Sequence, residues 1–213
     1  MTLAPDDYLT LADWRRQVAA LYANVRQLAG HDPVAAWESW RQTREQLYRE
    51  HPQSPVPAAR RATFRASHFP YDPALRFEAK VDPDPDAAAN EARLPSSAGD
   101  ALLFHRIGWL DVPFSAGSRR LALFWLAGYA GGLFLPFRDL TNGDETYAAG
   151  RYLLDGAKSA DLGGDPVRGT LILDFNFAYQ PSCAFDAKWA CPLAPTENWL
   201  DIAVQAGERL ERR

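Results

Sequence analysis

Two groups of polar residues and one pair of cysteines are the parts of this chain whose side chains could carry out chemistry. The first group, between residues 139 and 151, contains Asp139, Thr146, Tyr147 and Arg151. A buried arginine needs an anionic partner, because an isolated charge is costly to remove from water. Arg151 therefore either forms a structural clamp with a carboxylate of the protein, or acts as the fork of a pocket for an anionic ligand.

The second group contains Asp174, Asn176 and, further along the chain, Asn198. Side chains two residues apart point to the same face of a strand, so Asp174 and Asn176 are expected side by side. Buried polar groups need partners, and a bound ligand could supply them. Asp and Asn also bond readily to loop backbone, so both residues could instead cap the irregular segment over 179–198.

Cys183 and Cys191 are the only two cysteines and are separated by seven residues. This gap differs from the two-residue gap of redox motifs and zinc ribbons, and His68 and His105 lack ligand-like spacing, so the sequence predicts no metal site. The pair can be interpreted as two buried structural thiols, as a disulfide or redox sensor, or as the source of a nucleophile. The last interpretation requires a neighbouring cation that lowers the pKa of a thiol.

Common motifs of catalytic and cofactor sites are missing from the sequence. It contains no nucleophile elbow, phosphate-binding glycine loop, dinucleotide fingerprint or zinc-protease helix. Asp144 and Glu145 are neighbours that would face apart on a strand, so they make a poor acid–base pair. No cofactor is therefore indicated by motif, and the sequence leaves open whether the protein is an enzyme.

The composition predicts one domain, over residues 1–213, because a chain of this length with 47% hydrophobic residues can bury one substantial core. Lys and Arg number 23 against 27 Asp and Glu, with no basic stripe, which argues against nucleic-acid binding. No apolar run reaches the roughly 18 residues of a membrane-spanning helix. The first residues lack the basic and apolar regions of an export signal, so we expect a soluble cytoplasmic protein.

Two helices are expected at the start of the chain, as an arm over residues 1–52. Apolar residues recur at three- and four-residue steps over 10–28, which predicts a helix with Thr10 as its N-cap. A second helix is predicted over 33–50, with Asp32 as N-cap and a proline in its first turn. The prolines that follow predict an extended connector.

The rest of the chain, over 62–209, reads as β structure. Apolar and charged residues alternate over 75–81, as in a strand with one solvated face. Residues 82–100 have few apolar anchors and are predicted to be a mobile loop. Further strands are expected at 102–109, 113–117, 121–126, 133–137, 151–154, 170–175 and 200–204. The predicted fold class is mainly β (α+β), an antiparallel barrel or sandwich of about seven or eight strands.

Three stretches of this chain are unusual enough to indicate a family. They are FRDLTNGDETYAAGRYL (137–153), LDFNFAYQPSCAF (173–185) and CPLAPTEN (191–198). They resemble the signature blocks of a bacterial and archaeal family catalogued as domain of unknown function 1684. The resemblance implies no reaction. The positions that fall on the family's pattern are Thr146, Tyr147, Gly150, Arg151, Asp174, Asn176, Tyr179, Cys183, Cys191 and Asn198.

Three hypotheses about function follow from these residues. The first is a domain that binds a small polar or anionic ligand at the barrel mouth, through Arg151, Tyr147, Thr146, Asp139, Asp174, Asn176 and Asn198. The second is a thiol or redox enzyme that uses Cys183 or Cys191. The third is an interaction module whose helical arm, with Trp37 and Trp40, docks on a partner or on a second copy. The oligomeric state, with a homodimer as one option, stays open.

Overall fold

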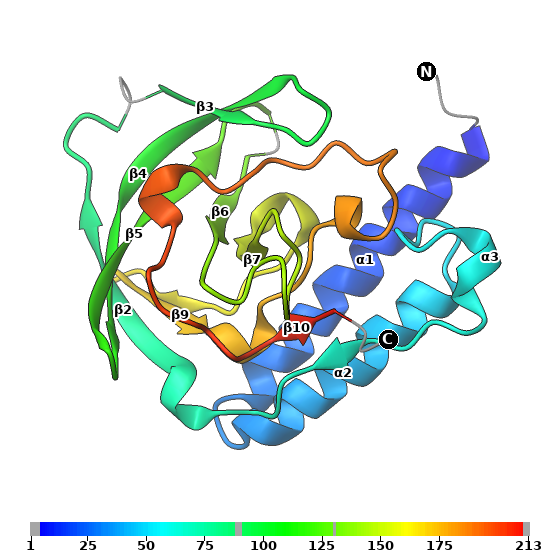
Figure 1. Cartoon of the computed structure of the whole chain (residues 1–213), viewed down its shortest axis with the longest axis horizontal. Helices are drawn as coiled ribbons and strands as arrows, with labels where there is room; N and C mark the ends of the chain where they lie inside the picture. The colour runs from blue at the N-terminus through cyan, green and yellow to red at the C-terminus, as the bar shows by residue number, and fades with distance from the viewer. Residues whose placement is uncertain (1–4, 88–90, 130, 211–213) are drawn as a thin grey trace.

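Two long helices lie against a curved antiparallel sheet in the computed structural model, which describes residues 5–87, 91–129 and 131–210 (Figure 1). The helices are α1 (Pro5–Leu28) and α2 (Pro33–Glu50), joined by a short turn. A third, single-turn helix, α3, covers Ala58–Arg61. None of the described helices combines the length and hydrophobicity needed to cross a lipid bilayer.

The start of α2 confirms the predicted N-cap at Asp32, but the predicted N-cap of α1 at Thr10 is wrong. The Asp32 side chain accepts a hydrogen bond from the backbone N–H of Ala35 at 2.9 Å, with Pro33 in the first turn. α1 begins at Pro5, so Thr10 lies inside the helix and its hydroxyl donates to the carbonyl of Asp7. Acidic residues in the first turn favour this earlier start because they complement the helix dipole.

The sheet is an open half-barrel of seven antiparallel strands, which confirms the α+β class. Along the sheet the strands follow the order β7 (Arg151–Asp155), β6 (Leu133–Phe137), β5 (Gly117–Leu126), β4 (Ala101–Phe114), β2 (Arg76–Pro83), β9 (Thr170–Asp174) and β8 (Gly164–Asp165). A further strand, β3 (Glu91–Pro95), pairs with the start of β4. Two short strands, β1 (Ser67–His68) and β10 (Glu208–Arg209), form a separate pair.

Three parts of the strand prediction were wrong. The segment 82–100, predicted as a loop, contains the end of β2 and the strand β3, which Leu94 anchors at 3% exposure; residues 88–90 lie outside the described residues. Residues 113–117 are the end of β4 and its turn into β5. Residues 200–204 form no strand: Leu200 and Ile202 bond to the backbone of the segment that follows β6, and Val204 bonds to the side chains of Asp139 and Arg151.

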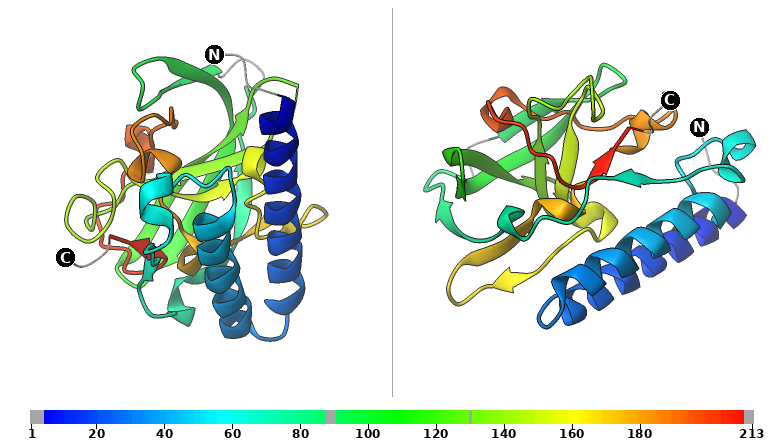
Figure 2. Two further views of the ribbon diagram at one scale, coloured as in Figure 1. Left: turned by 90° about the vertical axis from the view of Figure 1, so that its right-hand side faces the viewer. Right: turned by 60° about the horizontal axis from the view of Figure 1, so that its bottom comes forward.

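The helical pair covers one flank of the half-barrel (Figure 2). Trp40 of α2 is fully buried, and its ring centroid lies 5.3 Å from that of Phe177. Trp37 donates its indole N–H to the backbone carbonyl of Asn176 at 2.9 Å. These contacts join the helices to the barrel in one hydrophobic core. The tryptophans of the predicted arm are therefore occupied within the chain itself.

Candidate functional site

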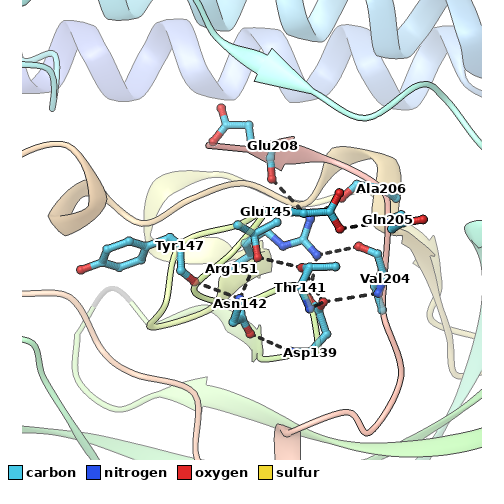
Figure 3. Close-up of polar contacts among 11 residues, drawn as sticks. Asp139, Thr141, Asn142, Glu145, Tyr147, Arg151, Val204, Gln205, Ala206 and Glu208 are labelled. Atoms are coloured by element: carbon cyan, nitrogen blue, oxygen red, sulfur yellow. Dashed lines mark hydrogen bonds and ion pairs between the residues drawn. The ribbon is translucent and has the colours of Figure 1, made fainter. Parts of the chain in front are cut away.

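Arg151 is buried at the start of β7 and is held by protein groups (Figure 3). Its Nη2 donates to Oδ2 of Asp139 at 2.7 Å and to the carbonyl of Val204 at 2.8 Å. Its Nη1 donates to the carbonyl of Ala206 and, at 3.3 Å, to that of Glu208. Burial lowers the pKa of Arg151, and the Asp139 carboxylate opposes that effect. The guanidinium thus ties the C-terminal segment to the β6–β7 connection.

The β6–β7 connection satisfies its other polar groups internally. Oδ1 of Asp139 accepts from the backbone N–H and the hydroxyl of Thr141, at 2.8 and 2.5 Å. The hydroxyls of Thr141 and Thr146 are 2.8 Å apart. The Asn142 side chain donates to Thr146 Oγ1 and to the carbonyl of Tyr147, both at 2.9 Å. This network has the form of the structural clamp that the sequence offered as one interpretation.

Glycines shape the turns of this connection. Gly143 has a φ of 91°, a backbone conformation that favours glycine in a tight turn. Gly150 has a φ of 99°, and a Cβ there would lie 2.5 Å from the carbonyl oxygen of Phe137. A side chain at position 150 would therefore push the connection away from β6.

Asp174 and Asn176 form a second network, and they do not share a strand face as predicted. β9 ends at Asp174, and residues 175–177 form a turn of 3-10 helix. Oδ1 of Asp174 accepts from the backbone and side-chain N–H groups of Asn176, at 3.1 and 2.8 Å. The Asn176 amide also makes two 2.8 Å hydrogen bonds to the backbone of Asp72. Asp174 therefore caps the turn that follows β9, and Asn176 bonds to the distant backbone of Asp72, so their hydrogen bonds differ from the expected capping of the segment 179–198.

Asn198 is fully buried in a third place. Its side chain accepts from the N–H of Ala122 and donates to the carbonyls of Ala122 and Pro136, at 2.7, 2.9 and 2.8 Å. It therefore fastens the C-terminal region to β5 and β6. The seven candidate ligand-binding residues thus form three separate networks, and none of them lines the cavities described below.

The two cysteines are buried, free and in contact. The backbone N–H of Cys183 lies 3.3 Å from Sγ of Cys191. A hydrogen bond from the Cys191 thiol, helped by Ser97 and Tyr147, lowers the pKa of Cys183 to about 6 against the opposing effect of burial. The same hydrogen bond and burial raise the pKa of Cys191. Sequence reasoning searched for a neighbouring cation, whereas here the second thiol polarises the first.

A cavity of about 310 Å³ lies between the helical pair and the barrel, and we call it the helix–barrel cavity. α1 and α2 supply one wall, and residues 157–160 and 179–191 supply the other. Its cationic lining residues are Arg15, Arg44 and Lys158, and none of the described lining residues is acidic. Sequence reasoning missed this site, because its walls come from segments far apart in the chain.

Two of the three cations form ion pairs with carboxylates of the protein. Nε of Arg44 lies 2.5 Å from Oε1 of Glu208, and the guanidinium stacks on the rings of Tyr48 and Tyr179 at 4.4 Å. Lys158 Nζ lies 3.1 Å from Asp155, and the lysine side chain is 42% exposed. Arg15 is exposed and makes no hydrogen bond or ion pair to another described residue. One positive charge of the cavity therefore remains without a counter-charge.

The neutral polar groups of the cavity include several donors. Burial raises the pKa of Tyr22 to about 12 and also raises the pKa of Tyr48 and of Tyr179, so all three keep their protons at neutral pH. Tyr22 accepts a hydrogen bond from the Trp40 indole at 3.2 Å, which leaves its own O–H free to donate. The indole N–H of Trp189 is shielded from solvent and has no partner among the described residues.

A larger cavity of about 520 Å³ lies beside the C-terminal strand. It is lined by residues of both charges, Arg60, Arg65 and Arg209 against Asp144 and Glu208. The mixed charges give it no clear preference for an anion or a cation. Its lining also reaches Leu210, the last described residue.

Comparison with known proteins identifies a family and solved structures that are similar to this chain. The family model described as "Protein of unknown function (DUF1684)" matches residues 63–209. The solution NMR structure of an uncharacterised protein of Haloarcula marismortui is similar, with 35% identity and a TM-score of 0.58. The match covers 81% of this chain and 91% of the archaeal one. No curated protein matches the chain. The chain therefore belongs to the DUF1684 family of proteins of unknown function.

Proposed function

We propose that this protein binds a small anionic molecule in the helix–barrel cavity. The observation that carries the proposal is the character of the described lining: three cations, no acidic side chain, and free hydrogen-bond donors. Buried polar groups are nearly always paired, so an unpartnered donor such as the Trp189 indole favours a ligand with acceptor atoms. This site takes the place of the Arg151 network, in which Asp139 and the C-terminal backbone occupy both Nη groups of the guanidinium.

Electrostatics support an anion over a neutral acceptor. Glu208 and Asp155 balance Arg44 and Lys158, and Arg15 is left as the excess charge. Hydrogen bonds between a cation and a carboxylate or phosphate are about twice as strong as those between neutral groups. An anionic group close to Arg15 and Lys158 would therefore gain most from this lining.

The rest of the lining favours a ligand with an apolar or aromatic part. Trp14, Val18 and Pro55 line the cavity together with the tyrosine rings. A volume of about 310 Å³ lies at the lower end of the roughly 300–1,000 Å³ that is typical of small-molecule sites. The proposed ligand is therefore small, with one charged group and one apolar group.

Calorimetric titration of the full chain with benzoate, phenyl phosphate, octanoate and inorganic phosphate tests the proposal. We expect at least one organic anion to bind, and Arg15→Gln or Lys158→Gln to weaken it roughly ten- to a hundredfold, because each removes a charge-assisted hydrogen bond. Arg16→Gln is the matched control, since Arg16 is exposed on α1 and does not line the cavity. Absence of binding by all four probes, or equal weakening by the control, would show that the proposal is wrong.

The contact between the cysteines favours a second candidate function, thiol chemistry at Cys183. A thiolate is the reactive form of cysteine, and a pKa of about 6 makes it the main form of Cys183 at pH 7. Both cysteines are nevertheless buried, at 8% and 2% exposure, which restricts access to them. The candidate therefore depends on reagents reaching Cys183.

Alkylation by iodoacetamide, followed by peptide mass spectrometry as a function of pH, tests this candidate. We expect Cys183 to react with a midpoint near pH 6 and Cys191 to react slowly over the same range. Cys191→Ala removes the hydrogen bond and should move the midpoint of Cys183 towards the ordinary thiol value of 9.0. Two thiols that stay unreactive in the folded protein, yet react once it is unfolded, would rule out this role.

The third hypothesis, docking through the helical arm, has less support. Trp37 and Trp40, which motivated it, are 5% and 0% exposed and pack against the barrel. They are therefore not available to a partner in this structure.

A further inference from the structure

We infer that the anion bound in the helix–barrel cavity is amphipathic: a carboxylate whose hydrocarbon chain occupies a neighbouring apolar slot. This inference rests on the proposed function and adds the class of ligand. The slot has a volume of about 170 Å³ and runs towards the barrel strands β4, β5 and β6. Its apolar walls are formed by Leu102, Phe104, Leu126, Leu133, Phe134 and Pro192.

Lys158 borders both the slot and the helix–barrel cavity. Three residues, Ala157, Lys158 and Ala190, line both of them. Ala157 and Lys158 belong to the short 3-10 turn Gly156–Lys158 that follows β7. Lys158, the only cation in the described lining of the slot, therefore stands between the apolar walls of the slot and the donors of the larger cavity.

Charge inside the slot is already balanced. Lys158 and Asp155 are the only charged residues of its described lining, and they form an ion pair at 3.1 Å. Asp155 also accepts a hydrogen bond from Tyr179 at 3.3 Å. A polar group pushed further into the slot would lose its hydration without finding a partner, which is costly. The slot thus selects a hydrocarbon group.

The position of Lys158 suits a ligand whose carboxylate head group binds the ammonium while its hydrocarbon tail lies in the slot. The Lys158 side chain is 42% exposed and lines the helix–barrel cavity, so its ammonium can reach an anion there. Burial alone would lower the pKa of Lys158, but Asp155 outweighs it and raises the pKa, so the ammonium stays charged. Apolar cavities of roughly 150 Å³ take up molecules the size of benzene. A slot of this size therefore accepts a short alkyl chain.

Isothermal titration of the full chain with acetate, butyrate, hexanoate, octanoate and 1-octanol tests the inference. We expect the affinity to rise about fourfold for each added methylene until the slot is full. We expect 1-octanol, which lacks the charge, to bind at least about tenfold more weakly than octanoate. Lys158→Gln should reduce the affinity for octanoate towards that for 1-octanol.

A variant that fills the slot separates tail binding from head binding. Leu102 lines the slot, does not line the larger cavity and is 37% exposed, so Leu102→Trp can narrow the slot with little risk to the fold. In Leu102→Trp we expect the affinity for fatty acids to increase less with chain length, while the affinity for benzoate stays unchanged. The control is Leu140→Trp at a residue that is 67% exposed and lines neither cavity.

The outcomes distinguish this inference from the proposed function on which it rests. Binding of benzoate or phenyl phosphate without any dependence on chain length in the fatty acids would overturn the amphipathic ligand and leave anion binding standing. Equal affinity for octanoate and 1-octanol would overturn the role of Lys158 at the head group. If no anion binds at all, both ideas are wrong.

Discussion

At the scale of single residues, this protein shows how a buried arginine can look functional in sequence and be structural in the fold. Arg151 is fully buried and bonds to one carboxylate and three backbone carbonyls. Two of those carbonyls, at Val204 and Ala206, belong to an irregular segment outside the sheet, and the third, at Glu208, begins the short strand β10. The Arg151 guanidinium supplies the hydrogen-bond donors that a neighbouring strand provides in a regular sheet.

We expect Arg151→Ala to lower the free energy of unfolding by about 3–5 kcal/mol, because it leaves the Asp139 charge buried and the carbonyls unpaired. Urea denaturation followed by circular dichroism measures the change. Arg16→Ala, at an exposed position, should stay within about 0.5 kcal/mol of the native chain. A variant of unchanged stability that has lost only ligand binding would restore Arg151 as a binding residue.

At the scale of elements, the attachment of the helical pair to the barrel decides whether the helix–barrel cavity exists. Trp37 makes a direct polar link between α2 and the barrel, through its hydrogen bond to the carbonyl of Asn176. Its ring also lies beneath the guanidinium of Arg41, at 4.5 Å from the centroid. The backbone N–H of the same Asn176 donates to the Asp174 carboxylate at the end of β9, so Asn176 connects the helix to that strand.

Trp37→Phe should lower the free energy of unfolding by about 1–3 kcal/mol, because the buried carbonyl of Asn176 loses its donor while most of the ring volume remains. Denaturation in urea, followed by far-ultraviolet circular dichroism, gives the difference. Trp125→Phe, at a residue that is 42% exposed, is the matched control and should change stability by less than about 0.5 kcal/mol. Equal effects of the two substitutions would contradict the role of this link.

At the scale of the whole molecule, helices and barrel share one core, so a group buried between them affects the stability of the entire chain. His68 of β1 is such a group, with its ring 6.3 Å from that of Trp37 and 5.6 Å from that of Trp40. Burial, together with the charges of Arg41 and Arg44, lowers the pKa of His68 to about 4 against the opposing effect of Glu208. The folded chain therefore holds His68 neutral at pH values where the unfolded chain protonates it.

We expect stability to fall as the pH drops from about 6.5, the ordinary pKa of histidine, to about 4. Within this window the unfolded state binds more protons, so acid favours unfolding, by on the order of 3 kcal/mol in total. Urea denaturation at pH 7, 5.5 and 4.5 measures the slope, and His68→Phe should be less sensitive over the same range. Parallel pH profiles for the native chain and His68→Phe would exclude His68 as the cause.

The sequence by itself determined the elements whose signals are local. Asp32 and Pro33 mark the start of α2, and the two-residue alternation over 75–81 marks β2, because capping and burial patterns are written in neighbouring residues. The unusual stretches around Arg151 and Asp174 indicated the family, and the family match covers both. The same patterns also showed which polar residues need partners.

Only the tertiary structure decided what those partners are. Arg151 bonds to carbonyls more than fifty residues away, at Val204, Ala206 and Glu208, and Cys183 meets Cys191 across a loop. The helix–barrel cavity likewise joins the first two helices to residues 157–191. A periodic pattern reports which face of an element is buried, but not which distant segment covers it. The path of the whole chain determines which distant segment covers each buried face, and therefore where a ligand could bind.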